Sequence, residues 1–283
     1  MSRVAIVTDS ASDLPRDAAR EHGIRIVPLA VTFGSETFKA GTEMSTEEFW
    51  RRMTAPDAPF PKTAASSPGD FKQVYEDAFA GGAEAIVAIH VAGTLSASIK
   101  SAEIARDMLS DREIHIVDCR SASMAQGLLA ILATELAAGG MDAPEIAQTV
   151  EERLPDLDLY VALDTLEYLK KGGRISGTQA AIGTLLSVKP IITVREGQVE
   201  TADRVRTRGK ARERVIELMT QRPVERLAVL YTPPADGEAY RTEVLGVLGD
   251  KLDPSKVSVQ PVGPSVGPHL GPGCLGGVVL YAR

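Results

Sequence analysis

The residues best suited to chemistry in this chain of 283 residues are small hydroxyl side chains next to strand-like apolar runs. They gather in four turns of the first half, at 8–13, 62–66, 90–98 and 118–123. Serine and threonine hydroxyls, together with the free backbone N–H groups of a helix start, can bind an anion, and the helix dipole favours that charge. Each hydroxyl could instead only cap its own helix. Because ligands of open α/β sheets bind beyond the carboxyl ends of the strands, we predict one site for a small anionic group.

Basic and rigid segments of the second half could complete that site. Lys170-Lys171-Gly172-Gly173-Arg174 is typical of an ordinary helix end whose lysines face the helix dipole. Arg206 belongs to a run of basic residues between 204 and 210, and a guanidinium group suits a carboxylate or phosphate. His269 lies inside the Gly/Pro-rich segment 263–273, where a structural role and a functional role are both open.

Several familiar signatures are absent from the sequence. It contains no G-x-G-x-x-G after a strand, no Walker loop, no G-x-S-x-G elbow and no His/Asp/Glu cluster with metal-ligand spacing. The sequence therefore gives no support for a nucleotide or metal enzyme, and we expect no cofactor.

Strand-length apolar runs alternate with helix-patterned segments along the whole chain, which predicts an α/β fold with mainly parallel sheets. Ser45 with Glu48, and Ser67 before Pro68, predict two helix starts. A polar helical bridge at 141–158 suggests two α/β domains, 1–157 and 158–283. The expected strands are 4–8, 24–29, 85–91, 113–118, 159–163, 188–194, 227–231, 257–262 and 277–281.

Composition predicts a folded cytoplasmic protein. Hydrophobic residues make up 44% and charged residues 24% of the chain, and the formal net charge of −7 argues against a general nucleic-acid binder. No apolar run approaches the roughly 20 residues that span a bilayer, and the start lacks the pattern of a signal peptide. The two cysteines, Cys119 and Cys274, have no ligand spacing and are expected to be reduced core thiols.

Taken in order, these blocks resemble the DegV family, which includes the FakB fatty-acid-binding proteins. The chain departs from the family at 63–66, where Thr-Ser-Gln-Pro is usual, and at 92–98, where Ser-Ser-Gly-Leu-Ser-Gly-Thr is usual. The matching blocks are Thr8-Asp9-Ser10, the Thr63 turn, Gly93-Thr94-Leu95-Ser96, Leu166 to Ile175, Val188-Lys189-Pro190, Val205-Arg206-Thr207, and His269 with Gly271-Pro272-Gly273.

The resemblance implies two α/β domains with a long-chain fatty acid in a buried tunnel at their cleft. It implies that Thr63 and Ser96 hydrogen-bond the carboxylate and that His269 joins directly or through water. Arg174 and Arg206 would surround the opening, where a fatty acid kinase phosphorylates the bound carboxylate, so that the carrier is not itself an enzyme. Stable membrane insertion is not expected, although transient membrane contact is compatible with this role. Four further residues are expected along the cleft, namely Asp9, Ser10, Gly93 and Thr94.

Three other interpretations stay open at this point. Ser96 and His269 could be the nucleophile and base of an enzyme that acts on acyl compounds, although no orienting carboxylate is identifiable. The same cleft could bind a small phosphate or carbonyl compound, as in the dihydroxyacetone kinase domains that the family resembles in fold. A purely regulatory module is the third, and no basic DNA-reading helix supports it.

Overall fold

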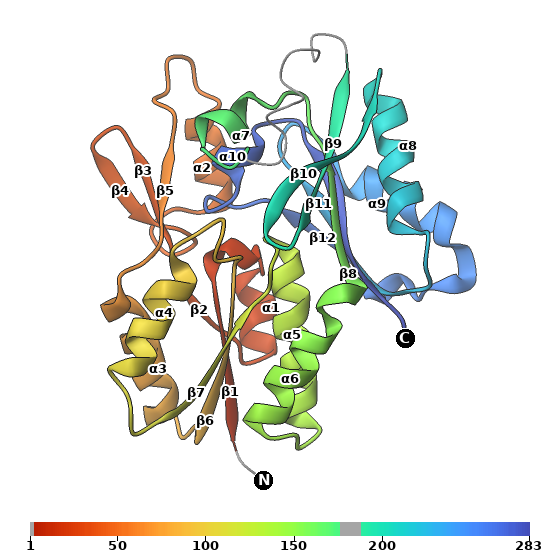
Figure 1. The fold of residues 1–283 in the computed structure, drawn as a ribbon. Helices are drawn as coiled ribbons and strands as arrows, with labels where there is room; N and C mark the ends of the chain where they lie inside the picture. Colours follow the sequence, from red (N-terminus) through yellow and green to blue (C-terminus); the bar gives the residue numbers. More distant parts are fainter. Residues whose placement is uncertain (1–2, 176–187) are drawn as a thin grey trace.

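The computed structural model describes residues 3–175 and 188–283, and its first half is built on a parallel sheet. The strand order is β2-β1-β6-β7, and every neighbouring pair is parallel. All six residues of β6 are buried, as expected for a strand with helices on both faces. Figure 1 shows α3 and α4 on one side of this sheet and α1, α5 and α6 on the other. The strands are β1 (Val4–Asp9), β2 (Arg25–Val27), β6 (Ala85–His90) and β7 (Glu113–Asp118), and the helices are α1 (Arg16–Glu21), α3 (Pro68–Ala80), α4 (Ser98–Asp107), α5 (Met124–Ala138) and α6 (Ala143–Arg153).

The second half carries a six-stranded sheet of order β10-β9-β8-β13-β11-β12. Among the strand pairs of this sheet in the described part of the chain, β11–β12 alone is parallel and the other four are antiparallel. The α/β class is thus confirmed, whereas the expectation of mainly parallel strands holds for the first sheet and is wrong for the second. Buried parallel and buried antiparallel strands have the same apolar composition, so the sequence pattern does not separate them. The strands are β8 (Leu157–Ala162), β9 (Lys189–Arg195), β10 (Gln198–Val205), β11 (Val224–Tyr231), β12 (Val257–Pro261) and β13 (Leu275–Tyr281), and the helices are α7 (Glu167–Lys171), α8 (Arg208–Met219), α9 (Gly237–Leu248) and α10 (Gly267–Leu270).

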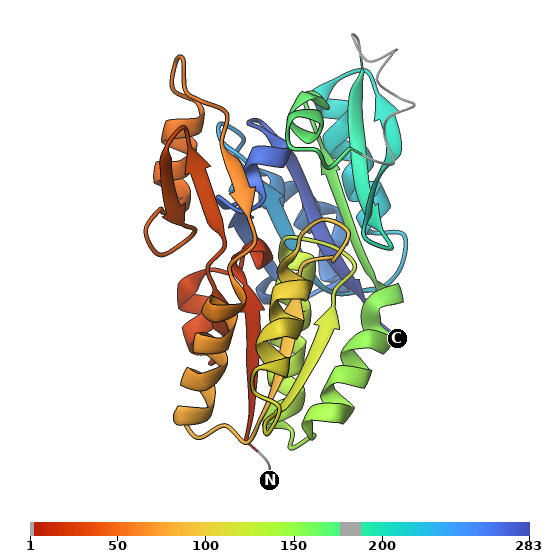
Figure 2. The same cartoon turned by 60° about the vertical axis from the view of Figure 1, so that its left-hand side comes forward.

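A small antiparallel sheet, which the sequence pattern did not predict, projects from the first half. It consists of β3 (Ala30–Phe33), β4 (Glu36–Lys39) and β5 (Lys62–Ala64), and it packs against α2 (Thr46–Met53). Its strands are only three or four residues long and half exposed, which is too short for a clear period-two pattern. Figure 2 shows α10 and the loops beside it running between this small sheet and the second sheet.

Both predicted helix starts are present. Ser67 and Asp70 form a full capping box at α3, with Pro68 in the first turn. Ser45 caps α2 by accepting the Glu48 backbone N–H, while the Glu48 carboxylate pairs with arginines of the same helix. Among the described residues, no helix has the length and apolarity that spanning a membrane requires.

Helix α5 joins the two halves. It packs on β1 and β6 of the parallel sheet and on β8, β11 and β13 of the second sheet. Its residues and the facing strands form one continuous cluster of buried apolar side chains. The predicted boundary between 157 and 158 falls at the start of β8, beside this shared core, and the division into two domains stays a prediction.

One long-range hydrogen bond ties the small sheet to the loop that carries His269. Trp50 Nε1 donates to the Val262 carbonyl over 2.8 Å, and the Trp50 ring packs edge-on against Phe49. We expect Trp50→Phe to lower the free energy of unfolding by about 1–3 kcal/mol, because a buried carbonyl loses its donor while the aromatic packing is kept. Urea denaturation measures the change. Glu47→Gln changes an exposed residue on the same helix and should alter the free energy of unfolding by no more than about 0.5 kcal/mol. Equal free energies of unfolding for the two variants would contradict this role for Trp50.

Candidate functional site

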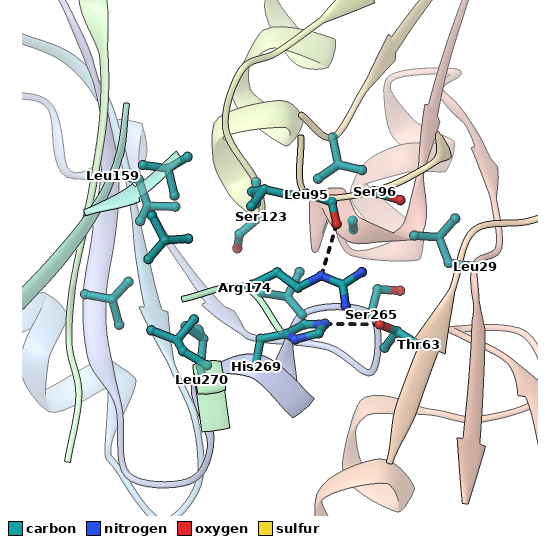
Figure 3. A pocket seen from close by; sticks show the side chains of 18 of the residues that line it. Leu29, Thr63, Leu95, Ser96, Ser123, Leu159, Arg174, Ser265, His269 and Leu270 are labelled. Carbon is teal, nitrogen blue, oxygen red and sulfur yellow. Dashed lines mark hydrogen bonds between the residues drawn. The ribbon is translucent and has the colours of Figure 1, made fainter. Parts of the chain in front are cut away.

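A cavity of about 360 Å³ lies where the turns that follow the parallel strands face the inner side of the second sheet. Most of its wall is aliphatic. Figure 3 shows Leu159 at one side of the cavity and Thr63, Ser265 and Leu29 at the other. The aliphatic part from the second sheet consists of Leu159, Val161, Ile192, Val194, Val199 and Leu230.

Thr63 and His269, two residues that the family resemblance implied for the site, meet in the polar part of the cavity. Thr63 Oγ1 lies 3.0 Å from His269 Nε2, although the two residues are 206 positions apart. Thr63 comes from β5 and His269 from α10, so the small sheet and the Gly/Pro loop together position the pair. Gly172, at the end of α7, leaves room for the imidazole, because a Cβ at this position would overlap His269 Nδ1.

The environment of His269 keeps its ring neutral. Burial and, to a smaller extent, the positive charge of Arg174 together lower the pKa of His269 to about 4. His269 Nδ1 is buried and has no hydrogen-bond partner in the described part of the chain. A buried N–H without an acceptor is costlier than a bare lone pair, so we assign the proton to Nε2, which donates to Thr63. The Thr63 hydroxyl is then free to donate into the cavity.

Arg174 also lines the cavity, nearer to the predicted head group than expected. Its Nε donates to the Leu95 carbonyl over 3.2 Å, and its Nη1 donates to the Gly172 carbonyl over 2.6 Å. The side chain thus reaches from the end of α7 to the turn after β6, and Figure 3 shows its guanidinium beside His269 and Ser265. The family resemblance implied a position for Arg174 around the opening, whereas the structure places it in the cavity wall.

Ser96 also lines the cavity, and its hydroxyl pairs within its own turn. Ser96 Oγ lies 2.9 Å from Ser98 Oγ and accepts the Ser98 backbone N–H over 3.2 Å. No hydrogen bond joins Ser96 to His269 among the described residues, so the geometry of a nucleophile next to its base is not formed here.

The other predicted cleft residues lie outside this cavity wall and hold the surrounding turns. Buried Asp9 caps the turn after β1 through the Ala11 N–H and bonds His90 Nδ1 over 3.0 Å. Gly93 donates its N–H to Asp118, and Thr94 donates its hydroxyl to the Gly197 carbonyl.

The last two predicted residues, Ser10 and Arg206, also lie outside the cavity wall. Ser10 lies directly behind the wall, where its Oγ is 2.8 Å from that of Ser265. Arg206 is exposed between β10 and α8, away from the cavity lining.

Sequence reasoning missed two serines that line the cavity, Ser123 and Ser265. Ser123 Oγ donates to Asp13 Oδ2 over 2.6 Å, and Asp13 Oδ1 accepts the Gly263 N–H over 2.8 Å. Burial raises the pKa of Asp13 to about 7, although both hydrogen bonds oppose the rise. The turns that contain these serines were recognisable in the sequence, but only the fold shows which hydroxyls face inward.

The site thus combines an aliphatic cavity with a polar part that offers hydrogen-bond donors and one guanidinium group. That combination suits an amphiphile with a single anionic head. Within residues 3–175 and 188–283, no three His, Cys, Asp or Glu side chains come together as metal ligands.

Comparison with known proteins identifies similar chains. The model of the DegV family, described as uncharacterised protein, matches residues 3–282. A DegV domain-containing protein of Caldanaerobacter subterraneus is 32% identical over 280 residues, which are 98% of each chain. A DegV family protein of Thermus thermophilus, whose structure is described by its fatty acid binding, has a TM-score of 0.90 and 34% identity over 99% of this chain and 100% of that one. A stearic-acid-binding protein of Eubacterium ventriosum has a TM-score of 0.85 and 27% identity over 99% and 98% of the two chains.

The protonation state of His269 gives a testable prediction. Nitrogen-15 NMR should find a neutral ring with the proton on Nε2 at pH 7 and a transition near pH 4, instead of the ordinary 6.5. Because the folded-state pKa is lowered, the stabilisation is complete above about pH 6.5 and is lost as the pH falls toward 4. In urea denaturation, the free energy of unfolding of the His269→Asn variant should depend less on pH between about 4 and 6.5. A transition near 6.5 in the folded protein would contradict the assignment.

Proposed function

This chain belongs to the DegV family, and from that premise we propose that it binds a long-chain fatty acid in the cavity between its two large sheets. The tail lies along the aliphatic wall, and the carboxylate lies beside Thr63 and Ser96, with His269 supporting Thr63. The observation that carries this proposal is the pairing of an aliphatic cavity with one cluster of polar donors. Structural relatives described as fatty-acid-binding proteins support it.

The acyl tail and the carboxylate head of a fatty acid would contribute differently to binding. A saturated tail of about 14 methylenes gains roughly 11 kcal/mol on leaving water, at about 0.8 kcal/mol each. Association and ordering take back a large part of this gain. The head group adds orientation, because a carboxylate buried without donors would be expensive. Thr63 and Arg174 supply a hydroxyl donor and a positive charge at one place in the wall.

We further propose that the protein is a carrier that presents the bound carboxylate to a separate fatty acid kinase for acyl-phosphate formation. The neutral His269 donates to Thr63 and so serves binding in this scheme, and Ser96 is engaged within its own turn. Exposed Arg206 offers a positive charge for the kinase contact. Both cysteines are buried free thiols, which agrees with action in the reducing cytoplasm.

The first test is mass spectrometry of an organic extract of the purified protein, where we expect one C16–C18 fatty acid per chain. Thr63→Val should weaken oleate binding to the delipidated protein by roughly tenfold, because it removes one hydrogen bond to a charged group at nearly constant volume. Calorimetric titration measures the change.

Thr32→Val is the matched control for this substitution. Thr32 lies on the adjoining strand of the same small sheet and pairs with exposed Thr37, outside the cavity. The Thr32→Val variant should bind oleate with the same affinity as the unaltered protein. An empty extract together with no binding of added oleate or palmitate would refute the carrier function.

The kinase step has its own prediction. Arg206→Glu should lower the rate at which a fatty acid kinase phosphorylates the bound acid by at least fivefold and leave the oleate Kd unchanged, because Arg206 is exposed and does not line the cavity. Lys251→Glu makes the same charge change at an exposed position near the end of α9 and should leave the rate unchanged. Equal phosphorylation rates for the Arg206→Glu and Lys251→Glu variants would show that Arg206 does not contribute to the contact with the kinase.

A further inference from the structure

Two serines of the cavity wall are backed by polar residues that lie behind the wall. Ser123 and Ser265 are only 1% and 6% exposed, so each hydroxyl must find its partners inside the protein or in the cavity. Ser123 pairs with Asp13 over 2.6 Å, and Ser265 pairs with Ser10 over 2.8 Å. The two pairs look alike, but the directions of their hydrogen bonds differ.

The hydroxyl hydrogen of Ser123 is already committed. An ionised carboxylate accepts and does not donate, so above the raised pKa of Asp13, about 7, Ser123 donates to Asp13, whose second oxygen accepts the Gly263 N–H. What Ser123 presents to the cavity is therefore its oxygen lone pairs. An anionic head group would be repelled by them.

The Ser10–Ser265 pair runs the other way. Ser10 Oγ accepts the Leu29 N–H over 2.8 Å, so its own hydrogen is free to be donated. Among the described residues the only hydrogen-bond partner of Ser10 besides this N–H is Ser265. If Ser10 donates to Ser265, the hydrogen of Ser265 is left for an acceptor in the cavity, and every donor is used. In the opposite direction Ser265 would donate to Ser10, and the hydrogen of the half-buried Ser10 would have only water in the neighbouring open pocket as its acceptor.

We propose that Ser265 is a carboxylate-binding residue of this chain, at the end of a polarised series of hydrogen bonds from the Leu29 N–H through Ser10 to Ser265. The inference rests on the proposed fatty-acid function and adds a residue to its head-group site. Hydrogen bonds that point the same way polarise one another, and a bond to an ionised acceptor is stronger than a neutral one. Figure 3 shows Ser265 beside Thr63 and Arg174, on the side of the cavity opposite Leu159.

The local sequence explains why such a residue is useful here. Ala64 and Ala65 follow Thr63 in the cavity wall and bring no side-chain donor. Ser96 Oγ accepts the Ser98 N–H and pairs with the Ser98 hydroxyl within its own turn. Ser265 enters from the Gly/Pro loop instead and places a second hydroxyl donor next to that of Thr63.

The experiment compares oleate with oleyl alcohol, which has the same tail and no charge, by calorimetric titration of the delipidated full chain. Ser265→Ala should reduce the preference for oleate over oleyl alcohol by roughly tenfold. Ser10→Ala should reduce it by less, because the Ser265 hydroxyl remains. Ser123→Ala is the matched control: it removes a buried wall hydroxyl whose hydrogen is committed to Asp13, and the preference should not fall.

Ser265→Thr keeps the hydroxyl and should keep the preference, which separates loss of the donor from damage to the loop. An unchanged preference in Ser265→Ala, or an equal loss in Ser123→Ala, would overturn the inference. Unaltered protein that binds neither ligand would overturn the proposed function, and the inference with it. Tight binding of both ligands by the unaltered protein with no effect at Ser265 would overturn the inference alone.

Discussion

The direction of each hydrogen bond is the constraint on which the cavity of this protein depends. A buried anion needs donors, and a serine or threonine hydroxyl donates into a cavity only if its hydrogen is not already donated elsewhere; a donor behind the hydroxyl, which its oxygen accepts from, keeps that hydrogen free. His269 does this for Thr63, and Ser10 does it for Ser265. Each supporting residue comes from a distant part of the chain, so the packing of the two halves is what orients the hydroxyls.

Precise loop placement follows from this constraint. His269 can approach Thr63 because position 172 has no side chain, and because Trp50 anchors the start of the Gly/Pro loop at the Val262 carbonyl. At Gly271 the backbone has a φ of +79°, and a Cβ would overlap the Tyr168 ring. The loop shape is thus fixed by contacts with α2 and α7, and the position of the imidazole follows from that shape.

The apolar pattern predicted much of the fold, and the resemblance to the DegV family implied part of the candidate site. Strand β7 was expected with its observed bounds, and Thr63, Ser96 and His269 all line the cavity. Strand β10 was missed, because Gln198–Val205 mixes polar and apolar residues beside a two-residue hairpin turn at Glu196-Gly197. Ser123 and Ser265 were not separable from capping serines, since the side of a turn that faces inward depends on tertiary packing. For the same reason Asp9 and Thr94 proved to hold the turns and do not line the cavity.

The two carbonyl groups that hold Arg174 have a consequence for affinity. Because Leu95 and Gly172 fix its guanidinium from both sides, this long side chain has lost most of its rotational freedom before any ligand arrives. An arginine that is free in solution would lose that entropy during association, at a cost of about 0.5–1.5 kcal/mol. Here the loss occurs during folding. The site is therefore preorganised, and the attraction between the guanidinium group and an anion contributes to binding without an offsetting loss of side-chain entropy.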